Sequence, residues 1–176
     1  GGDIAWITPA DLSNYKNKYI ERGQRNISKI GLDNSSAKLL PKGTVLFSSR
    51  APIGYTVIAK NEITTNQGFK SLILTKSSYP DYIYYYLQAS KQLAESYASG
   101  TTFLELSATK FSQIPIPLPP LSEQHHIVEK IEELFSELDK AQENLLNAQK
   151  QLEIYKQVVL KDALMGKFTK NREQWR

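Results

Sequence analysis

The stretch that decides the fold runs from residue 122 to residue 165 and reads SEQHHIVEKIEELFSELDKAQENLLNAQKQLEIYKQVVLKDALM, without a glycine or a proline. Apolar side chains recur along it at alternating steps of four and three residues, which is a heptad repeat. The positions of this seam are Ile127, Ile131, Leu134, Leu138, Ala141, Leu145, Ala148, Leu152, Tyr155 and Val159. The repeat predicts one long helix of the coiled-coil type, with Ser122 as the residue that caps its first turn.

The length of this seam bears on what it packs against. At a rise of 1.5 Å per residue the seam would run for roughly 50 Å, which is more than a small domain needs to cover its own core. Two interpretations are open: the helix lies along its own domain, or it packs against a partner helix. The heptad period, and the lack of a second helical pattern of matching length in the sequence, favour a partner helix.

A proline-rich segment separates this helix from the rest of the chain. Residues 114–120 read IPIPLPP. Each proline fixes φ and removes a backbone donor, so the segment should run extended as an edge strand or a connector. We therefore divide the chain into a domain over residues 1–120 and a helix with its tail over residues 121–176.

The first of these parts reads mostly as short strands. Apolar runs that end at Phe47, Ala59 and Leu74 are separated by turns rich in glycine and proline. One helix is expected after Pro80, where apolar residues recur at helical spacing until Gly100 stops it. The prediction is an α+β fold: a mixed, mostly-β domain with a few helices, followed by a long C-terminal coiled-coil helix.

Composition narrows the class of protein. The sequence has no cysteine, which excludes disulfides and cysteine-ligated zinc and is compatible with a reducing compartment. No apolar run reaches the roughly 18 residues of a membrane span, and the first residues lack the features of a secretory leader, so we expect a cytoplasmic protein without a membrane anchor.

The positive charge is concentrated in the predicted domain. Residues 1–120 hold 13 Lys and Arg against 8 Asp and Glu, giving +5, whereas residues 121–176 hold 9 against 10, giving −1. A positive field concentrated in one domain suits a polyanion such as DNA.

Motifs for catalysis are missing from the sequence. It contains neither the glycine-rich cofactor loop of a methyltransferase nor the Glu-x-Lys triplet of a metal-dependent restriction nuclease. The two histidines, His125 and His126, are adjacent on the predicted helix and so point about 100° apart, which keeps them from sharing a metal. We predict no catalytic residue, no metal site and no cofactor in these residues.

Hydrogen-bonding and basic residues gather in four stretches that should be loops, namely residues 15–29, 48–50, 64–67 and 99–102. Arg can form paired hydrogen bonds with guanine, Asn or Gln can do so with adenine, and Ser or Thr can hold phosphates. The plainer interpretation is that these are turn and cap residues. Both interpretations stay open from the sequence.

Several of these stretches together resemble the specificity subunit of type I restriction-modification systems. The matching motifs are GGDIAWITPADL (residues 1–12), LPKGTVLFSSRAPIG (40–54), NQGF (66–69), SGTT (99–102), IPLPPLSEQ (116–124) and ALMGKF (163–168). The resemblance covers nearly the whole chain. It implies a target-recognition domain that reads one half of a split site in double-stranded DNA, and a helix that sets the spacing and docks methyltransferase subunits.

The resemblance also implies where the chemistry takes place. Modification subunits would supply S-adenosylmethionine and flip the target adenine, and a separate restriction subunit would translocate and cut the DNA. Such subunits usually have two recognition domains and two antiparallel helices, whereas this chain has one of each. It is therefore expected to be a half-subunit that forms a homodimer through antiparallel helices, or a fragment of a longer subunit. The resemblance also implies strand-forming residues before the first motif, so we expect the domain either to be trimmed at its start or to obtain this piece from elsewhere.

Motifs that all members share cannot carry base specificity, so the readers should lie in less patterned loops. As DNA contacts we predict Lys16, Lys18, Arg22, Gln24, Arg25, Asn26, Arg50, Lys70, Thr101 and Thr102. As dimer and partner contacts of the helix we predict Ile127, Ile131, Leu134, Leu138, Leu145, Leu152, Tyr155 and Val159. The alternative functions are a coiled-coil assembly module that binds only protein, and a nuclease or methyltransferase.

Overall fold

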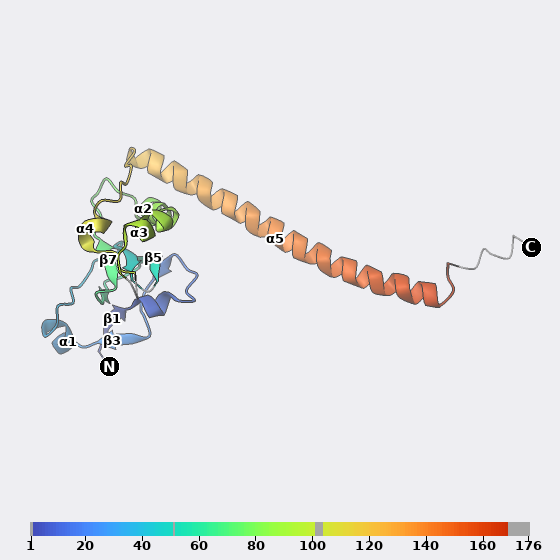
Figure 1. Ribbon diagram of the computed structural model, residues 1–176, viewed down its shortest axis with the longest axis horizontal. Helices are drawn as coiled ribbons and strands as arrows, with labels where there is room; N and C mark the ends of the chain where they lie inside the picture. The colour runs from blue at the N-terminus through green and yellow to red at the C-terminus, as the bar shows by residue number, and fades with distance from the viewer. Residues whose placement is uncertain (1, 51, 101–103, 169–176) are drawn as a thin grey trace, which may run out of the picture. The chain divides into compact units, whose positions relative to one another are not determined.

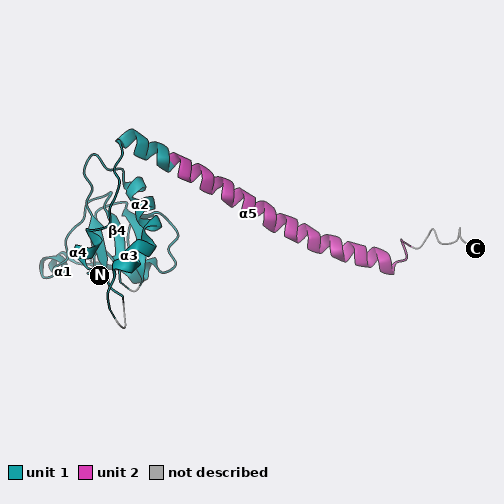
Figure 2. Ribbon diagram, turned by 45° about the horizontal axis from the view of Figure 1, so that its top comes forward, with its two compact units in different colours: residues 1–128 teal, residues 129–176 magenta. Residues whose placement is uncertain are grey.

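The computed structural model describes residues 2–50, 52–100 and 104–168. The chain forms two compact units, Gly1–Val128 and Glu129–Arg176 (Figure 2). The first unit extends past the boundary that the sequence predicted at Pro120. The reason is that the helix α5 (Leu121–Leu164) begins within this unit and contributes the buried side chains of Gln124 and Val128 to it.

The first unit contains two small sheets and several helices (Figure 1). A four-stranded sheet has the order β2-β5-β4-β7, and a three-stranded sheet has the order β3-β1-β6. The strands are β1 (Ile4–Ile7), β2 (Tyr19–Ile20), β3 (Arg25–Ile27), β4 (Val45–Ser49), β5 (Ile53–Ala59), β6 (Thr64–Thr65) and β7 (Phe69–Leu72). The pairs β2-β5 and β1-β6 are parallel and the others are antiparallel. Together with the helices, this arrangement confirms the predicted α+β fold.

Strand β4 is buried along its whole length and on both faces. Val45 and Phe47 belong to an apolar cluster that also contains Leu87 from the helices. Leu46 belongs to a second cluster, with Ile7 of the three-stranded sheet. Successive side chains of a strand alternate between its faces, so one continuous apolar run serves both clusters. The four-stranded sheet therefore lies between the helices of residues 80–111 and the three-stranded sheet, as Figure 1 also shows.

Two helices stand where the sequence predicted one. The helices α2 (Pro80–Ala89) and α3 (Lys91–Tyr97) are separated at Ser90, whose backbone leaves the helical range. The Ser90 hydroxyl donates to the carbonyl oxygen of Tyr86 at 2.8 Å, and the backbone N–H of Ser90 donates to the same oxygen at 2.9 Å. Three shorter helices complete the unit: η1 (Pro9–Leu12), α1 (Lys29–Asp33) and α4 (Ala108–Phe111).

The proline-rich segment 114–120 is a connector and not an edge strand. The hydroxyls of Tyr82 and Tyr86 hold it in place by donating to two of its backbone carbonyl oxygens, at 2.8 and 2.6 Å. The helix α5 begins directly after it, at Leu121. Ser122 therefore lies inside the first turn, and the prediction that it caps the helix was wrong.

The first turn of α5 is fixed by a buried amide. The Gln124 side chain is completely buried; its Oε1 accepts from the backbone N–H of Tyr79 at 2.8 Å. Its Nε2 donates to the carbonyl oxygens of Ser77 and Pro119, at 2.9 and 2.8 Å. A buried polar group without partners costs about 1–3 kcal/mol, so these bonds favour one placement of this turn on the first unit.

Most of the seam predicted along α5 is exposed in the single chain. Leu138 and Leu145 are 64% and 72% exposed. Ile127 differs, because it is partly buried and packs against the apolar cluster of the first unit. Within the described ranges, no helix is long and apolar enough to cross a membrane.

The backbone of Gly54 provides a test of the fold. Its φ is +103°, and a Cβ there would lie 2.6 Å from Cγ of Lys91. We predict that Gly54→Ala lowers the free energy of unfolding by about 1–3 kcal/mol, because the alanine would be strained. Gly31→Ala is the control, since this glycine lies in α1 with its nearest neighbour 3.5 Å from the added carbon. Urea denaturation followed by circular dichroism measures both; a Gly54→Ala protein as stable as wild type would contradict the prediction.

Candidate nucleic-acid interface

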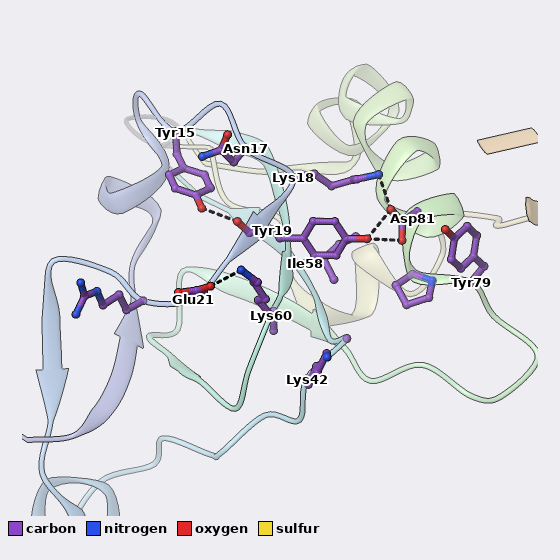
Figure 3. Close-up of a pocket in the computed structure, with 14 residues that line it drawn as sticks. Tyr15, Asn17, Lys18, Tyr19, Glu21, Lys42, Ile58, Lys60, Tyr79 and Asp81 are labelled. Atoms are coloured by element: carbon purple, nitrogen blue, oxygen red, sulfur yellow. Dashed lines mark hydrogen bonds and ion pairs between the residues drawn. The ribbon is translucent and has the colours of Figure 1, made fainter. Parts of the chain in front are cut away.

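A cavity of about 900 Å³ opens on the first unit, between β2, one end of β5 and the start of α2 (Figure 3). Segments far apart in the sequence build it. Its lining consists of Tyr15, Asn17, Lys18, Tyr19, Glu21, Arg22, Lys42, Gly43, Ile58, Ala59, Lys60, Tyr79, Pro80 and Asp81. Ile58 and Ala59, which end β5, supply buried apolar surface, and most of the remaining lining residues are aromatic, basic or acidic.

Tyr19 is held in the wall of this cavity by a buried carboxylate. Its hydroxyl donates to both carboxylate oxygens of Asp81, at 2.7 and 2.8 Å. Asp81 is buried and is paired with Lys18, whose Nζ also lies 5.1 Å from the centre of the Tyr85 ring. Desolvation, and next the hydrogen bond to Asp81, raise the pKa of Tyr19. Tyr19 is therefore a neutral side chain whose hydroxyl is held in place by Asp81. The ammonium group of Lys18 already has Asp81 as its ion-pair partner.

Three other cationic side chains line the cavity. Arg22 and Lys42 are exposed, and neither forms an ion pair with another residue that the structure describes. Lys42 stands on a tight turn in which Gly43 has a φ of +85°, the conformation that favours glycine. Lys60 pairs with Glu21, and both side chains are exposed, so water screens the pair.

The predicted contacts that follow Arg22 in the sequence lie on or next to β3. Gln24, Arg25 and Asn26 are all exposed. In the antiparallel register Arg25 is the partner of Trp6 on β1, so the two side chains leave the same face of the three-stranded sheet. Lys16 lines a separate hollow of about 300 Å³ on the first unit.

Of the last four predicted contacts, the two that the structure describes, Arg50 and Lys70, are not brought together with these. Arg50 lies 3.7 Å from Glu105 in an ion pair, and Lys70 is half-buried on β7. Thr101 and Thr102 lie outside the described residues. The structure thus gathers Lys18 and Arg22 at the cavity, with Gln24, Arg25 and Asn26 farther along the same segment.

The hydroxyl and amide clusters of the sequence are largely structural. The hydroxyls of Ser48, Ser49 and Thr64 are buried, and each donates to a backbone carbonyl oxygen at 2.7 to 3.1 Å. The Oδ1 of Asn66 accepts from the backbone N–H of Gly68 at 3.0 Å. For these four residues the plainer interpretation, that they shape turns and strand ends, is the one that the structure supports.

Outside the stretch 15–29, sequence reasoning missed four polar residues of the cavity: Lys42, Lys60, Tyr79 and Asp81. Lys42 had a local signal, because a Pro-Lys-Gly turn presents its central residue to solvent. The other three had none, since only the tertiary fold brings their segments together. The Asn17 side chain makes no hydrogen bond to another described residue and is exposed.

The histidines do not form a reactive cluster. The ring centres of His125 and Tyr79 are 3.9 Å apart, so His125 packs on an aromatic wall of the first unit. Across residues 2–50, 52–100 and 104–168, no group of three or more His, Cys, Asp or Glu could hold a metal ion.

The chain thus combines an α+β domain that has a basic cavity with a long helix whose apolar seam is exposed. Residues 1–148 match the family model of the type I restriction modification DNA specificity domain. The chain belongs to this family, whose role is DNA target recognition, and this confirms the resemblance found in its motifs.

Individual relatives agree with this assignment. The MjaIX specificity subunit of Methanocaldococcus jannaschii is 43% identical over 163 residues, which are 91% of this chain and 36% of that protein. The EcoR124I/EcoR124II specificity subunit of Escherichia coli is 26% identical over 90% of this chain and 41% of that protein. This chain therefore spans well under half the length of these relatives.

Solved structures show the same fold. A chain from a study of complex assembly and conformational transition of the type I R-M system gives a TM-score of 0.66 at 23% identity, covering 93% of this chain and 38% of that one. The HsdS subunit from Thermoanaerobacter tengcongensis gives a TM-score of 0.59, also at 23% identity, covering 79% of this chain and 32% of that one.

Proposed function

We propose that this chain reads one half of a bipartite sequence in double-stranded DNA, as the specificity component of a type I restriction-modification complex. The observation that carries this proposal is the exposed set of Arg22, Gln24, Arg25 and Asn26, beside a cavity with unneutralised cations. Arg, Gln and Asn are the side chains that form paired hydrogen bonds with bases, and exposed cations suit the phosphates.

Catalysis would belong to partner subunits in the cytoplasm. Modification subunits would bind S-adenosylmethionine and methylate the target adenine, and a restriction subunit would cut the DNA. This chain would recognise the DNA sequence and contribute no catalytic residue. Support comes from the relatives, which are named as specificity subunits of restriction enzymes.

The exposed seam of α5 supports a homodimer. Burial of one leucine or isoleucine side chain is worth about 1.5–3 kcal/mol, so the exposed stripe gains by pairing with another helix. Residues 129–146 hold six acidic and two basic side chains, and residues 147–168 hold four basic and two acidic ones. Antiparallel pairing of two copies sets the acidic half of each helix beside the basic half of the other.

An antiparallel register centred on Glu143 also suits the sizes of the side chains. It places Ala141 opposite Leu145, and Ala148 opposite Leu138, so every small seam residue meets a large one. A helix of 44 residues is about 66 Å long, and a two-fold dimer of this kind would hold two recognition domains at a set spacing. Such a dimer would read an interrupted palindrome.

A second candidate function is a protein-only assembly module, for which the same exposed seam is the supporting observation. The two functions differ in what the first unit binds. Only the DNA reader requires Arg25 and its neighbours to meet phosphates or bases.

DNA binding by this chain should weaken steeply between about 50 and 200 mM salt, because phosphate contacts release counterions. Arg25→Gln should lower the affinity and reduce the slope of log affinity against log salt by about 1. Lys110→Gln is the matched control, since it removes the same charge from α4. Fluorescence anisotropy of a labelled duplex measures both. Salt-independent binding, or equal behaviour of the two variants, would favour the protein-only module.

The homodimer should dissociate when a charge is placed in the seam. We predict that Leu145→Glu is monomeric in sedimentation at micromolar concentration, whereas Asn147→Glu, with the same charge outside the seam, stays dimeric. Thermal unfolding of the first unit should be unchanged, because Leu145 lies in the second unit and is exposed. A wild-type monomer at that concentration would contradict the homodimer. Unfolding of the first unit in Leu145→Glu would show that the seam belongs to its core.

A further inference from the structure

The cavity of Figure 3 holds more positive charge than the fold neutralises. Four cationic and two acidic side chains line it. The buried acid, Asp81, is already paired with Lys18. Glu21 pairs with Lys60 in solvent, a contact that an incoming phosphate can replace. Arg22 and Lys42 have no ion-pair partner among the described residues, so the mouth of the cavity attracts an anion.

Among these charges, Tyr19 offers a partly exposed aromatic ring, whose centre lies 5.5 Å from the Nζ of Lys18. Tyr19 is 42% exposed, although its hydroxyl is held by both oxygens of Asp81. A ring fixed at its tip loses little conformational freedom when a flat group stacks on it. Stacking of bases on exposed aromatic rings, combined with cations that follow the phosphates, is how proteins bind unpaired nucleic acid.

Another residue of the cavity wall, Asn17, could form hydrogen bonds with the edge of a base. The Asn17 carboxamide is exposed and without a hydrogen-bond partner among the described residues, so both its donor and its acceptor are available. In Figure 3 Tyr19 stands between Asn17 on one side and Lys60 and Lys42 on the other. A base on the ring would thus have an amide toward one side and cations for its phosphates toward the other.

We propose that this cavity binds a short unpaired stretch of DNA, with one base stacked on Tyr19 and neighbouring phosphates on the cations at its mouth. The site shares Arg22 with the set proposed to read the duplex, whereas Gln24, Arg25 and Asn26 do not line the cavity. This proposal depends on the proposed function in one respect. It takes DNA, and not a free nucleotide, as the molecule that brings the base and its phosphates to the cavity.

The test is anisotropy of a labelled single-stranded oligothymidylate with the full chain. Wild type should bind it, and Tyr19→Ser should weaken binding by about 5- to 100-fold, the effect of losing one base-aromatic stack, whereas Tyr19→Phe should stay within about twofold. Both variants lose the bond to Asp81, so the ring is what distinguishes them. Lys42→Gln should also weaken binding, and Lys110→Gln on α4 should not.

Lys42 is exposed, so Lys42→Gln preserves the fold and decides the matter even where Tyr19→Ser unfolds. The proposal is overturned if each variant binds as its control does, or if wild type binds a blunt duplex and not the oligonucleotide; the second result leaves the proposed function intact. Failure to bind either DNA would overturn both. Displacement of the bound oligonucleotide by AMP would show that a free nucleotide is enough to fill the cavity. No displacement would show that the cavity requires a DNA strand.

Discussion

Strand β4 is buried on both faces, and the rest of the first unit depends on this constraint. One face closes the apolar cluster beneath the helices, and the other closes the cluster beneath the three-stranded sheet. Because β5 pairs with β4, and β2 pairs with the far edge of β5, the position of Tyr19 follows from the same strand. Asp81 reaches Tyr19 from α2 in the helical layer. The cavity is thus formed where the layers meet and cannot be attributed to one loop.

The two units differ in which kind of side chain is buried and which is exposed. In the first unit, polar side chains such as Ser48 and Gln124 are buried with hydrogen-bond partners, and the side chains suited to DNA are exposed. In the second unit, leucines of the seam are exposed, a state that water disfavours and that a partner helix would relieve. This division fits a family whose members recognise DNA and work within multi-subunit restriction enzymes.

Patterns with a period were predictable from the sequence, and contacts between distant segments were not. The heptad repeat gave the long helix, and the apolar runs gave β4, β5 and β7, because burial imposes its period on the chain. The break at Ser90 and the start of α5 at Leu121 are local features of the backbone, which the spacing of apolar residues does not reveal. Arg22 was found from its residue type, whereas Lys60 joins the cavity only through the strand order.

A chain that reads a half-site and pairs two-fold with a second copy should prefer an interrupted palindrome. Selection of bound sequences from a pool of randomised duplexes, with the chain alone and with a modification subunit, tests this most directly. We predict enrichment of a split motif whose halves are inverted copies at one spacing, as two antiparallel helices would impose. Binding of the modification subunit without any enriched sequence would contradict it.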